Sequence, residues 1–230
     1  MGVEEAKHAA QLFGGTIEAR SIGEPPRVDG LSAVIGGGEA GPCATWAKNA
    51  ERLGIVFMNI GCTSDDARGT ACSRFAFHVI PSDAMIRDAR TMAGDPASDV
   101  VAWDSSLSRF GADTLNQRYR SRFNQPMTAD AWAGWIAVKI LWEAALRQRS
   151  GDASALAAFL DRESTQFDGH KGQPLSFRSW DHQLRQPVYV IAPASRALRE
   201  VPEIPPKSSV RDALDRLGAT RESSACRFER

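Results

Sequence analysis

Three glycines form the pattern in this chain that most suggests chemistry. Gly36, Gly38 and Gly41, inside the stretch "AVIGGGEAGPCATWAK", have the spacing G-x-G-x-x-G. After a buried strand and before a helix, this spacing is the fingerprint of dinucleotide-binding folds. Such a site also needs an acidic residue about 20 positions later, at the end of the next strand, to bind the ribose. Asn59 and Cys62 stand there instead, so a nucleotide-using α/β enzyme is only the alternative interpretation.

The same turn can hold a small ligand without any nucleotide. Glycines at the end of a strand let the backbone approach a ligand, and the first amides of the following helix can bind a carboxylate. The sequence places three such loops after three buried strands, at Gly36–Gly41, Gly61–Thr63 and His78–Ser82. Because ligands of open parallel sheets bind outside the carboxyl ends of the strands, these loops predict a binding edge.

Catalytic residues are not evident. His8, His170 and His182 are expected in solvent, whereas His78 ends a buried strand, where a hydrogen bond to a ligand and a structural role are both open. Cys43 stands at a helix start, which can lower the pKa of a thiol, but the spacing identifies no partner base. The chain also lacks the G-x-S-x-G turn of serine hydrolases. We therefore expect a protein that is not an enzyme.

The sequence predicts no metal or cofactor either. Its cysteines, Cys43, Cys62, Cys72 and Cys226, form no C-x-x-C pair, and none has a histidine at zinc-ligand spacing. We expect buried or free thiols, although two of Cys62, Cys72 and Cys226 can pair in an oxidising compartment.

Tryptophans offer two further candidates. A stripe on one predicted helix is explained by core packing, with the aromatic wall of a ligand cleft as the alternative; it consists of Trp132, Trp135 and Trp142. Trp103 and Asp104 follow the predicted strand "VVAW", where a chain passing between two lobes presents side chains to a cleft. They are the better ligand candidates.

Composition and charge restrict the function classes. The chain has 230 residues, with 28 Lys and Arg against 28 Asp and Glu, so its net charge is zero. No basic surface is available to attract nucleic acid. The most apolar long stretch, Ala129–Leu146, is interrupted by Lys139 and Glu143 and is short for a bilayer span. The first residues lack the basic and apolar segments of a secretory signal, so no export signal is expected.

The predicted elements alternate between strand and helix in the first half of the chain. Helices are expected at 3–13, 44–53 and 83–93, the last capped by Ser82, and strands at 16–22, 31–35, 55–60 and 74–80. This rhythm indicates an α/β fold with a parallel sheet flanked by helices.

The second half is expected to differ. After the strand "VVAW", helices are predicted at 107–123, at 129–149 with Thr128 as cap, and at 153–163. Two strands with alternating Leu175, Phe177, Val188 and Val190 follow, joined by a polar turn at 181–185, and one capped helix lies within "SSVRDALDRLG".

Several stretches together resemble the type I periplasmic substrate-binding proteins of ABC transporters, of the branched-chain amino-acid-binding group. The resemblance lies in "LSAVIGGGEAGPCATWAKNAERLGIVFMNIG", "RFAFHVIPSDAMIRDA", "AWAGWIAVKILWEAAL" and "FDGHKGQPLSFRSWDHQLRQPVYVI". "VVAWDSSLSRFGADTLNQRYRSRF" and "LDRLGATRESSACRF" are similar to the subgroup associated with PQQ-dependent alcohol oxidation.

The resemblance implies a two-lobe periplasmic receptor that closes on a small, carboxylate-bearing solute and delivers it to a membrane permease. It assigns residues 1–92 and 124–150 to the first lobe, 96–123 and 151–192 to the second, and 193–230 to a tail. The ligand contacts that it implies, by position, are Gly37, Gly38, Gly61, Cys62, His78 and Asp104.

The chain departs from this family in one respect. Family members have several strand-helix units between the stretches like "PSDAMIRDA" and "VVAWD", where this chain has only residues 90–99. We therefore expect a truncated second lobe. Uncovered strand edges would favour a homodimer, and a remnant that acts as an interaction module without a ligand is a further alternative.

Overall fold

A parallel sheet of β1 (Ala33–Gly36), β2 (Val56–Asn59) and β3 (Ala76–His78) forms the centre of the structure. The computed structural model describes residues 1–22, 27–205 and 207–228. The strands lie in the order β1-β2-β3, with Ile35 beside Met58 and Asn59 beside His78. All residues of β2 and β3 are buried, which explains their continuous apolar sequence. The predicted parallel sheet is confirmed.

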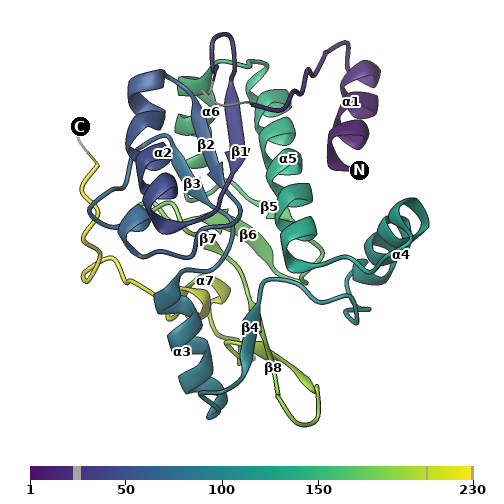
Figure 1. Ribbon diagram of the computed structural model, residues 1–230, viewed down its shortest axis with the longest axis vertical. Helices are drawn as coiled ribbons and strands as arrows, with labels where there is room; N and C mark the ends of the chain where they lie inside the picture. Colours follow the sequence, from purple (N-terminus) through teal and green to yellow (C-terminus); the bar gives the residue numbers. More distant parts are fainter. Residues whose placement is uncertain (23–26, 206, 229–230) are drawn as a thin grey trace.

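Helices cover both faces of this sheet (Figure 1). On one face lies α2 (Ala40–Leu53), with the short 3-10 helix η1 (Asp66–Arg68) beside it. On the other face lie α5 (Ala129–Gln148) and α6 (Ala153–Leu160), and α1 (Gly2–Leu12) packs on the outside of α5. The predicted α/β fold with flanking helices is therefore present.

Local signals set the ends of these helices. The Ser82 hydroxyl accepts a hydrogen bond from the Met85 amide at 3.2 Å and so caps α3 (Asp83–Ala93), which ends at Gly94 in the left-handed conformation. Thr128 caps α5 in the same way. The expected start of α2 at residue 44 was wrong, because the helix begins at Ala40 and takes Pro42 into its first turn.

Two small antiparallel sheets complete the molecule. One has the order β4-β8-β9, formed by β4 (Asp99–Val101), β8 (Val188–Ile191) and β9 (Leu198–Val201), and α3 packs against it. The other contains β5 (Phe167–Asp168), β6 (Pro174–Phe177) and β7 (Leu184–Arg185), and a bridge between His78 and Gln183 links it to β3. The remaining helices are α4 (Ala112–Phe123) and α7 (Val210–Leu214). Strand β9 was not predicted.

The expected pairing of the two late strands is wrong. The strand that holds Leu175 and Phe177 pairs with β5 and β7, whereas the strand that holds Val188 and Val190 pairs with β4 and β9. The segment between them, expected as a polar turn at 181–185, is buried. Alternation correctly indicated strands here, but it carries no information on which strand is the neighbour.

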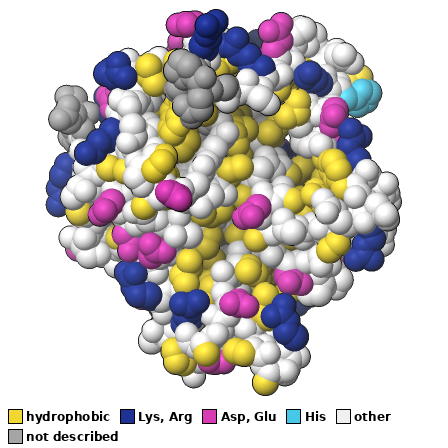
Figure 2. Space-filling model, in the orientation of Figure 1, with side chains coloured by type: hydrophobic (Ala, Val, Ile, Leu, Met, Phe, Trp, Pro, Cys, Tyr) yellow, Lys and Arg dark blue, Asp and Glu magenta, His cyan; other side chains and the backbone are white. Residues whose placement is uncertain are grey.

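The strand expected at 16–22 is also absent, because these residues form no ladder with any neighbour. Alternation alone does not make a strand, because the segment must also reach an edge in register. Among the described residues the outer edge of β1 carries no further strand. As the outer strand, β1 keeps Ala33 and Ile35 only half-buried. Figure 2 shows hydrophobic side chains gathered over this part of the molecule, between α2 and α5.

A disulfide joins Cys72 to Cys226, which are 154 positions apart in the sequence. This is one of the pairings that the sequence left open. Cys43 and Cys62 are free and buried. The bond holds the segment after α7 against the loop that precedes β3.

The expected division into two lobes and a tail stays a prediction, although α3 packs on the sheet of β4, β8 and β9 rather than on the parallel sheet. The predicted homodimer is equally untested. Among the described residues, no helix combines the length and the apolar character that a membrane crossing requires.

Removing the disulfide should destabilise the protein. The double variant Cys72→Ala/Cys226→Ala should lose about 2–4 kcal/mol of unfolding free energy in urea, because the bond restricts the unfolded chain. Wild type in a reducing buffer should fall to the stability of the variant, and the variant should not respond to the reductant. Equal stability of the oxidised and reduced wild type would contradict the expected role of the bond.

Candidate functional site

The loops after β1 and β2 touch through their backbones. A Cβ atom on Gly37 would lie 2.3 Å from the amide nitrogen of Gly61, so only glycine permits this approach. Gly38 has a φ of 141°, which side chains rarely adopt. The structure thus brings Gly37, Gly38 and Gly61 together, as the sequence predicted for the ends of parallel strands.

Asn59 holds the second loop in place. Its side-chain oxygen accepts from the Gly61 and Cys62 amides, and its side-chain nitrogen donates to the Cys62 carbonyl at 2.8 Å and lies 3.0 Å from Nδ1 of His78. Two donors and two acceptors are therefore all used. A dinucleotide-binding fold has an acidic residue at this position. In this protein the position is Asn59, whose side chain instead holds the loop in shape.

His78 is completely buried at the end of β3. Because Nδ1 faces the Asn59 amide donor, it acts as the acceptor and Nε2 carries the proton of the neutral ring. Nε2 makes no hydrogen bond to any described residue. Burial, followed by the charges of Arg68 and His182, lowers the pKa of His78 well below its usual value.

The third loop is tied to the second by Arg68. Its buried guanidinium donates to the carbonyls of Cys62, Ser64 and Ile80 and to the side chain of Gln183. Burial lowers the pKa of Arg68 to about 10, so the group stays charged at neutral pH. The spacing of the sequence gave no signal for this long-range contact.

The thiols beneath the loops are inert. Cys62 is 2% exposed and packs near Cys43. Burial, followed by a hydrogen bond with Cys62, raises the pKa of Cys43 to about 12. The lowered pKa that a helix start suggests is therefore wrong for Cys43, because loss of hydration outweighs the helix dipole.

Asp104 lies elsewhere, on a groove of about 460 Å³ between α3, β4 and the start of α5. The predicted pair Trp103 and Asp104 both line it. The other expected contacts lie apart from this groove, at the edge of the parallel sheet. Sequence reasoning missed Arg90 and Arg196, which also line the groove, and it took Thr128 only for a helix cap.

A stack of large side chains supports the groove from inside. The rings of Trp103 and Trp132 lie parallel at 5.7 Å, and Lys171 Nζ lies 4.1 Å from the Trp132 ring. Lys171 also donates to Gln186 at 2.7 Å and to the Pro187 carbonyl at 3.0 Å. Burial lowers the pKa of Lys171 well below its usual value. Trp132 is therefore core, as the packing interpretation predicted.

Two histidine predictions need correction. His182 is 1% exposed, and its nitrogens lie 3.1 Å from the Ala76 carbonyl and 3.0 Å from Asp161. His170 is partly covered, because its ring stacks on Trp135. Distant partners bury the His182 ring and partly cover that of His170, whereas His8 is exposed as expected. Within the described ranges, no group of three or more His, Cys, Asp or Glu could hold a metal ion.

Substitution of Gly37 should separate the two loops. Gly37→Ala should lower the unfolding free energy by about 1–3 kcal/mol, because the new methyl group overlaps the Gly61 backbone. Gly41→Ala is the matched control, since a Cβ there meets nothing within 4 Å. In the first turn of α2 it should gain about 0.5–1 kcal/mol. Equal effects in urea denaturation would contradict the close approach.

Acid should destabilise the protein through His78. Its pKa is lower in the folded than in the unfolded chain, so below about pH 6.5 the unfolded state takes up a proton that the folded state refuses. Unfolding free energy should fall from pH 7 to 5, by at most about 1.4 kcal/mol per unit for this group.

His78→Asn should reduce that slope, since it keeps an acceptor towards Asn59 and does not titrate. Denaturation at several pH values measures both slopes. Identical slopes for wild type and variant would show that His78 does not resist protonation.

Comparisons with known proteins agree on the architecture. No family model and no curated protein matches the sequence. Among solved structures, a periplasmic binding protein from Burkholderia mallei superposes with a TM-score of 0.73 at 12% identity, over 98% of this chain and 92% of that one. A branched-chain amino acid transporter substrate-binding protein from Streptococcus pneumoniae, in complex with isoleucine, gives 0.64 at 11% identity, over 86% and 91%.

A third structure shows a different ligand on the same fold. It is a solute-binding protein of an ABC transporter from Rhodopseudomonas palustris, in complex with 3,4-dihydroxybenzoic acid. Its TM-score is 0.55 at 10% identity, over 86% of this chain and 81% of that one. At these identities the likeness concerns the fold, and this chain has the fold of the type I periplasmic binding proteins.

Proposed function

We propose that this protein is a non-catalytic, substrate-binding component of an ABC transporter that binds a small carboxylate-bearing solute in the groove beside β4. The shared fold supports the class, since the similar structures named above are transport binding proteins. By the same analogy the protein works in the periplasm and passes its solute to a membrane permease.

The observation that carries this proposal is the placement of Asp104 and the start of α5 on one groove. Ala129 and Asp130 are the first residues of α5, and their amides make no hydrogen bond within the described chain. The amino end of a 20-residue helix attracts a carboxylate. Asp104, half-buried, offers a carboxylate that can receive an ammonium group.

The other charges of the groove are balanced. Arg90 and Arg196 face Asp99 and Asp104 around the same volume, and Arg196 lies 3.9 Å from Asp99. A groove with equal numbers of both charges suits a solute that carries both. We therefore extend the proposal to a zwitterion such as an amino acid, with the buried Trp103 beneath its side chain.

The loops at the end of the parallel sheet have a supporting part in this proposal. Gly37, Gly38 and Gly61 stay predicted ligand contacts, reached if α3 and its sheet close towards them. Cys62 and His78 are buried beneath these loops. They would therefore affect binding by positioning the loops, not by touching the solute.

Calorimetric titration of the dialysed protein with leucine, isoleucine and 3,4-dihydroxybenzoate tests the proposal. Asp104→Asn should weaken amino acid binding by about tenfold or more, because it removes the charge that pairs with the ammonium group. Binding of dihydroxybenzoate, which has no ammonium, should change little. Asp113→Asn is the control, because this exposed acid on α4 forms no ion pair with any described residue and lies off the groove.

Each outcome separates the interpretations. If only dihydroxybenzoate binds, the proposal of a carboxylate-bearing solute stands and its extension to a zwitterion is overturned. Heat with ATP or NAD⁺ would favour the nucleotide-using enzyme. No heat with any compound would favour a remnant without a ligand and overturn the proposed function.

A further inference from the structure

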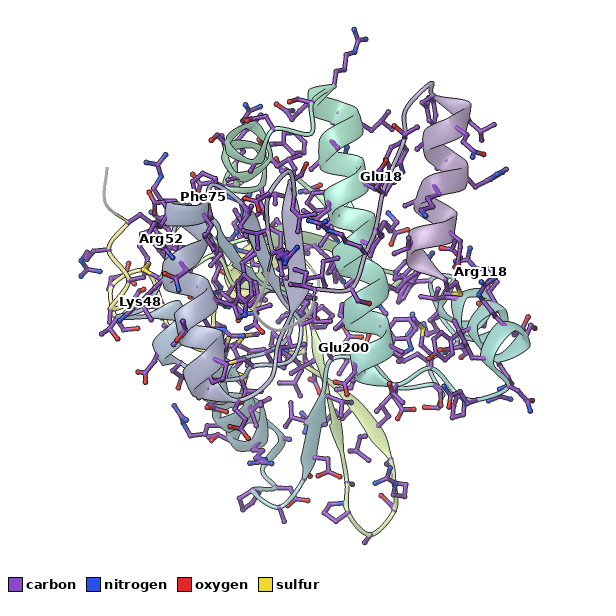
Figure 3. The ribbon with its side chains drawn as sticks, turned by 45° about the horizontal axis from the view of Figure 1, so that its top comes forward. Glu18, Lys48, Arg52, Phe75, Arg118 and Glu200 are labelled. Carbon is purple, nitrogen blue, oxygen red and sulfur yellow. A yellow bond between two sulfur atoms is a disulfide. The ribbon has the colours of Figure 1, made fainter. Side chains whose placement is uncertain are left out.

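A second concave site, apart from the groove, lies beside the Cys72–Cys226 disulfide. We name it the disulfide pocket; it has a volume of about 310 Å³. Lys48 and Glu51 of α2, the loop of residues 69–74 and the segment 225–228 line it. Figure 3 shows Lys48 on the outer side of α2, next to the C-terminal segment. Three parts of the chain that are distant in sequence therefore build one pocket.

The pocket concentrates positive charge in a protein whose net charge is zero. Lys48, Arg74 and Arg227 are exposed, and none of them lies within 4.0 Å of a carboxylate among the described residues. Glu51 is the one acidic side chain in the lining, so three cations less one carboxylate leave two positive charges. Elsewhere many arginines are paired with acids, for example Arg211 and Arg221 with Glu163.

Neutral donors add to this charge. The hydroxyl and amide of Thr70 and the amide of Ser73 make no hydrogen bond within the described chain. The Ser73 hydroxyl accepts from the Phe75 amide at 3.1 Å, which leaves its own proton free. A lining of cations and unused N–H and O–H groups offers many donors and few acceptors, which is the requirement of an oxyanion.

We infer that the disulfide pocket binds a small oxyanion, a phosphate-bearing or polycarboxylate molecule, and that it does so only in the oxidised protein. The volume accommodates a molecule larger than a single phosphate group. This site is separate from the proposed solute groove, and no lining residue belongs to both.

Binding should depend on the disulfide because of the position of Arg227 in the chain. This residue lies directly after Cys226, and its guanidinium donates to the Ser224 and Cys226 carbonyls at 2.8 and 2.7 Å. Arg227 is thus fixed to the segment and not to the body of the protein. Cys226 attaches the segment to the wall of the pocket, and beyond it the Phe228 ring lies 4.3 Å from the His182 ring. Reduction removes the covalent attachment next to Arg227, so this cation loses its fixed position in the lining.

Calorimetric titration with inorganic phosphate and with citrate, at low ionic strength, tests the inference. Arg74→Gln and Arg227→Gln should each weaken binding by about tenfold, since each removes a charged donor. Glu51→Gln should tighten binding, because it removes the one acidic side chain among the described lining residues. Reduction of wild type should weaken binding about as much as Arg227→Gln does.

Arg216→Gln is the matched control, because it makes the same charge change at an exposed site outside the pocket. If it weakens binding as much as Arg74→Gln, the anions respond to overall charge and the inference is overturned. It is overturned equally if neither probe binds at millimolar concentration, or if the reduced protein binds both probes unchanged. Arg74→Gln and Arg227→Gln should leave titrations of the groove with amino acids unaltered, so the two sites fail or succeed independently.

Discussion

The guanidinium of Arg68 is the contact on which the arrangement of this protein depends. It lies where the loops after β2 and β3 meet the segment between β6 and β7, and its hydrogen bonds reach all of them. Gln183 continues the connection, because its side-chain nitrogen donates to the His78 and Ile80 carbonyls. A buried cation persists only when hydrogen bonds compensate for its lost hydration, and the Arg68 guanidinium makes four of them. The segment between β6 and β7 must therefore pass next to Arg68. There it joins the sheet of β5, β6 and β7 to the parallel sheet.

The interior around this point is polar where a simple sandwich of sheet and helices would be apolar. Asn59, His78 and Lys171 are buried there in addition to Arg68 and Gln183. Such networks fix one arrangement, because a shift of any member leaves a buried group without its partner. The same buried side chains support the groove. The Trp103 ring in its lining stacks on Trp132, and Lys171 contacts the Trp132 ring. The outer wall of the groove, formed by α3 and β4, carries charged side chains such as Arg90 and Asp99.

Elements with local signals could be predicted from the sequence. The interval from Ser82 to Gly94 contains its own cap and its own stop, and α3 has the expected bounds. Strands β2 and β3 were recognisable because both of their faces are buried, and β1 was recognisable from its short apolar run, although it is only partly buried. The place of Asp104 on the groove could be predicted, because it follows the end of a strand. Arg196 reaches the groove from the loop between β8 and β9, and no sequence pattern predicted this.

Long-range partners explain what could not be predicted. Residues 181–185 were predicted to form a polar turn, yet they are buried. Gln183 bonds to Arg68, and His182 lies within hydrogen-bond distance of Asp161 and the Ala76 carbonyl. Residues 16–22 alternate like a strand, but they do not pair with the outer edge of β1. In both cases the local pattern was sound and the environment decided the outcome. The same holds for Cys43, whose helix position suggested a reactive thiol and whose burial makes it inert.

The disulfide has a mechanical consequence. It closes the chain from Cys72 to Cys226 into a covalent ring, so a force applied to the two ends of the chain cannot lengthen anything within that ring. The load falls on the residues before Cys72, which include β1 and β2, while β3 and both antiparallel sheets lie inside the ring. Under tension the parallel sheet would therefore come apart from its β1 side, and the residues around the groove would remain folded as one unextended body.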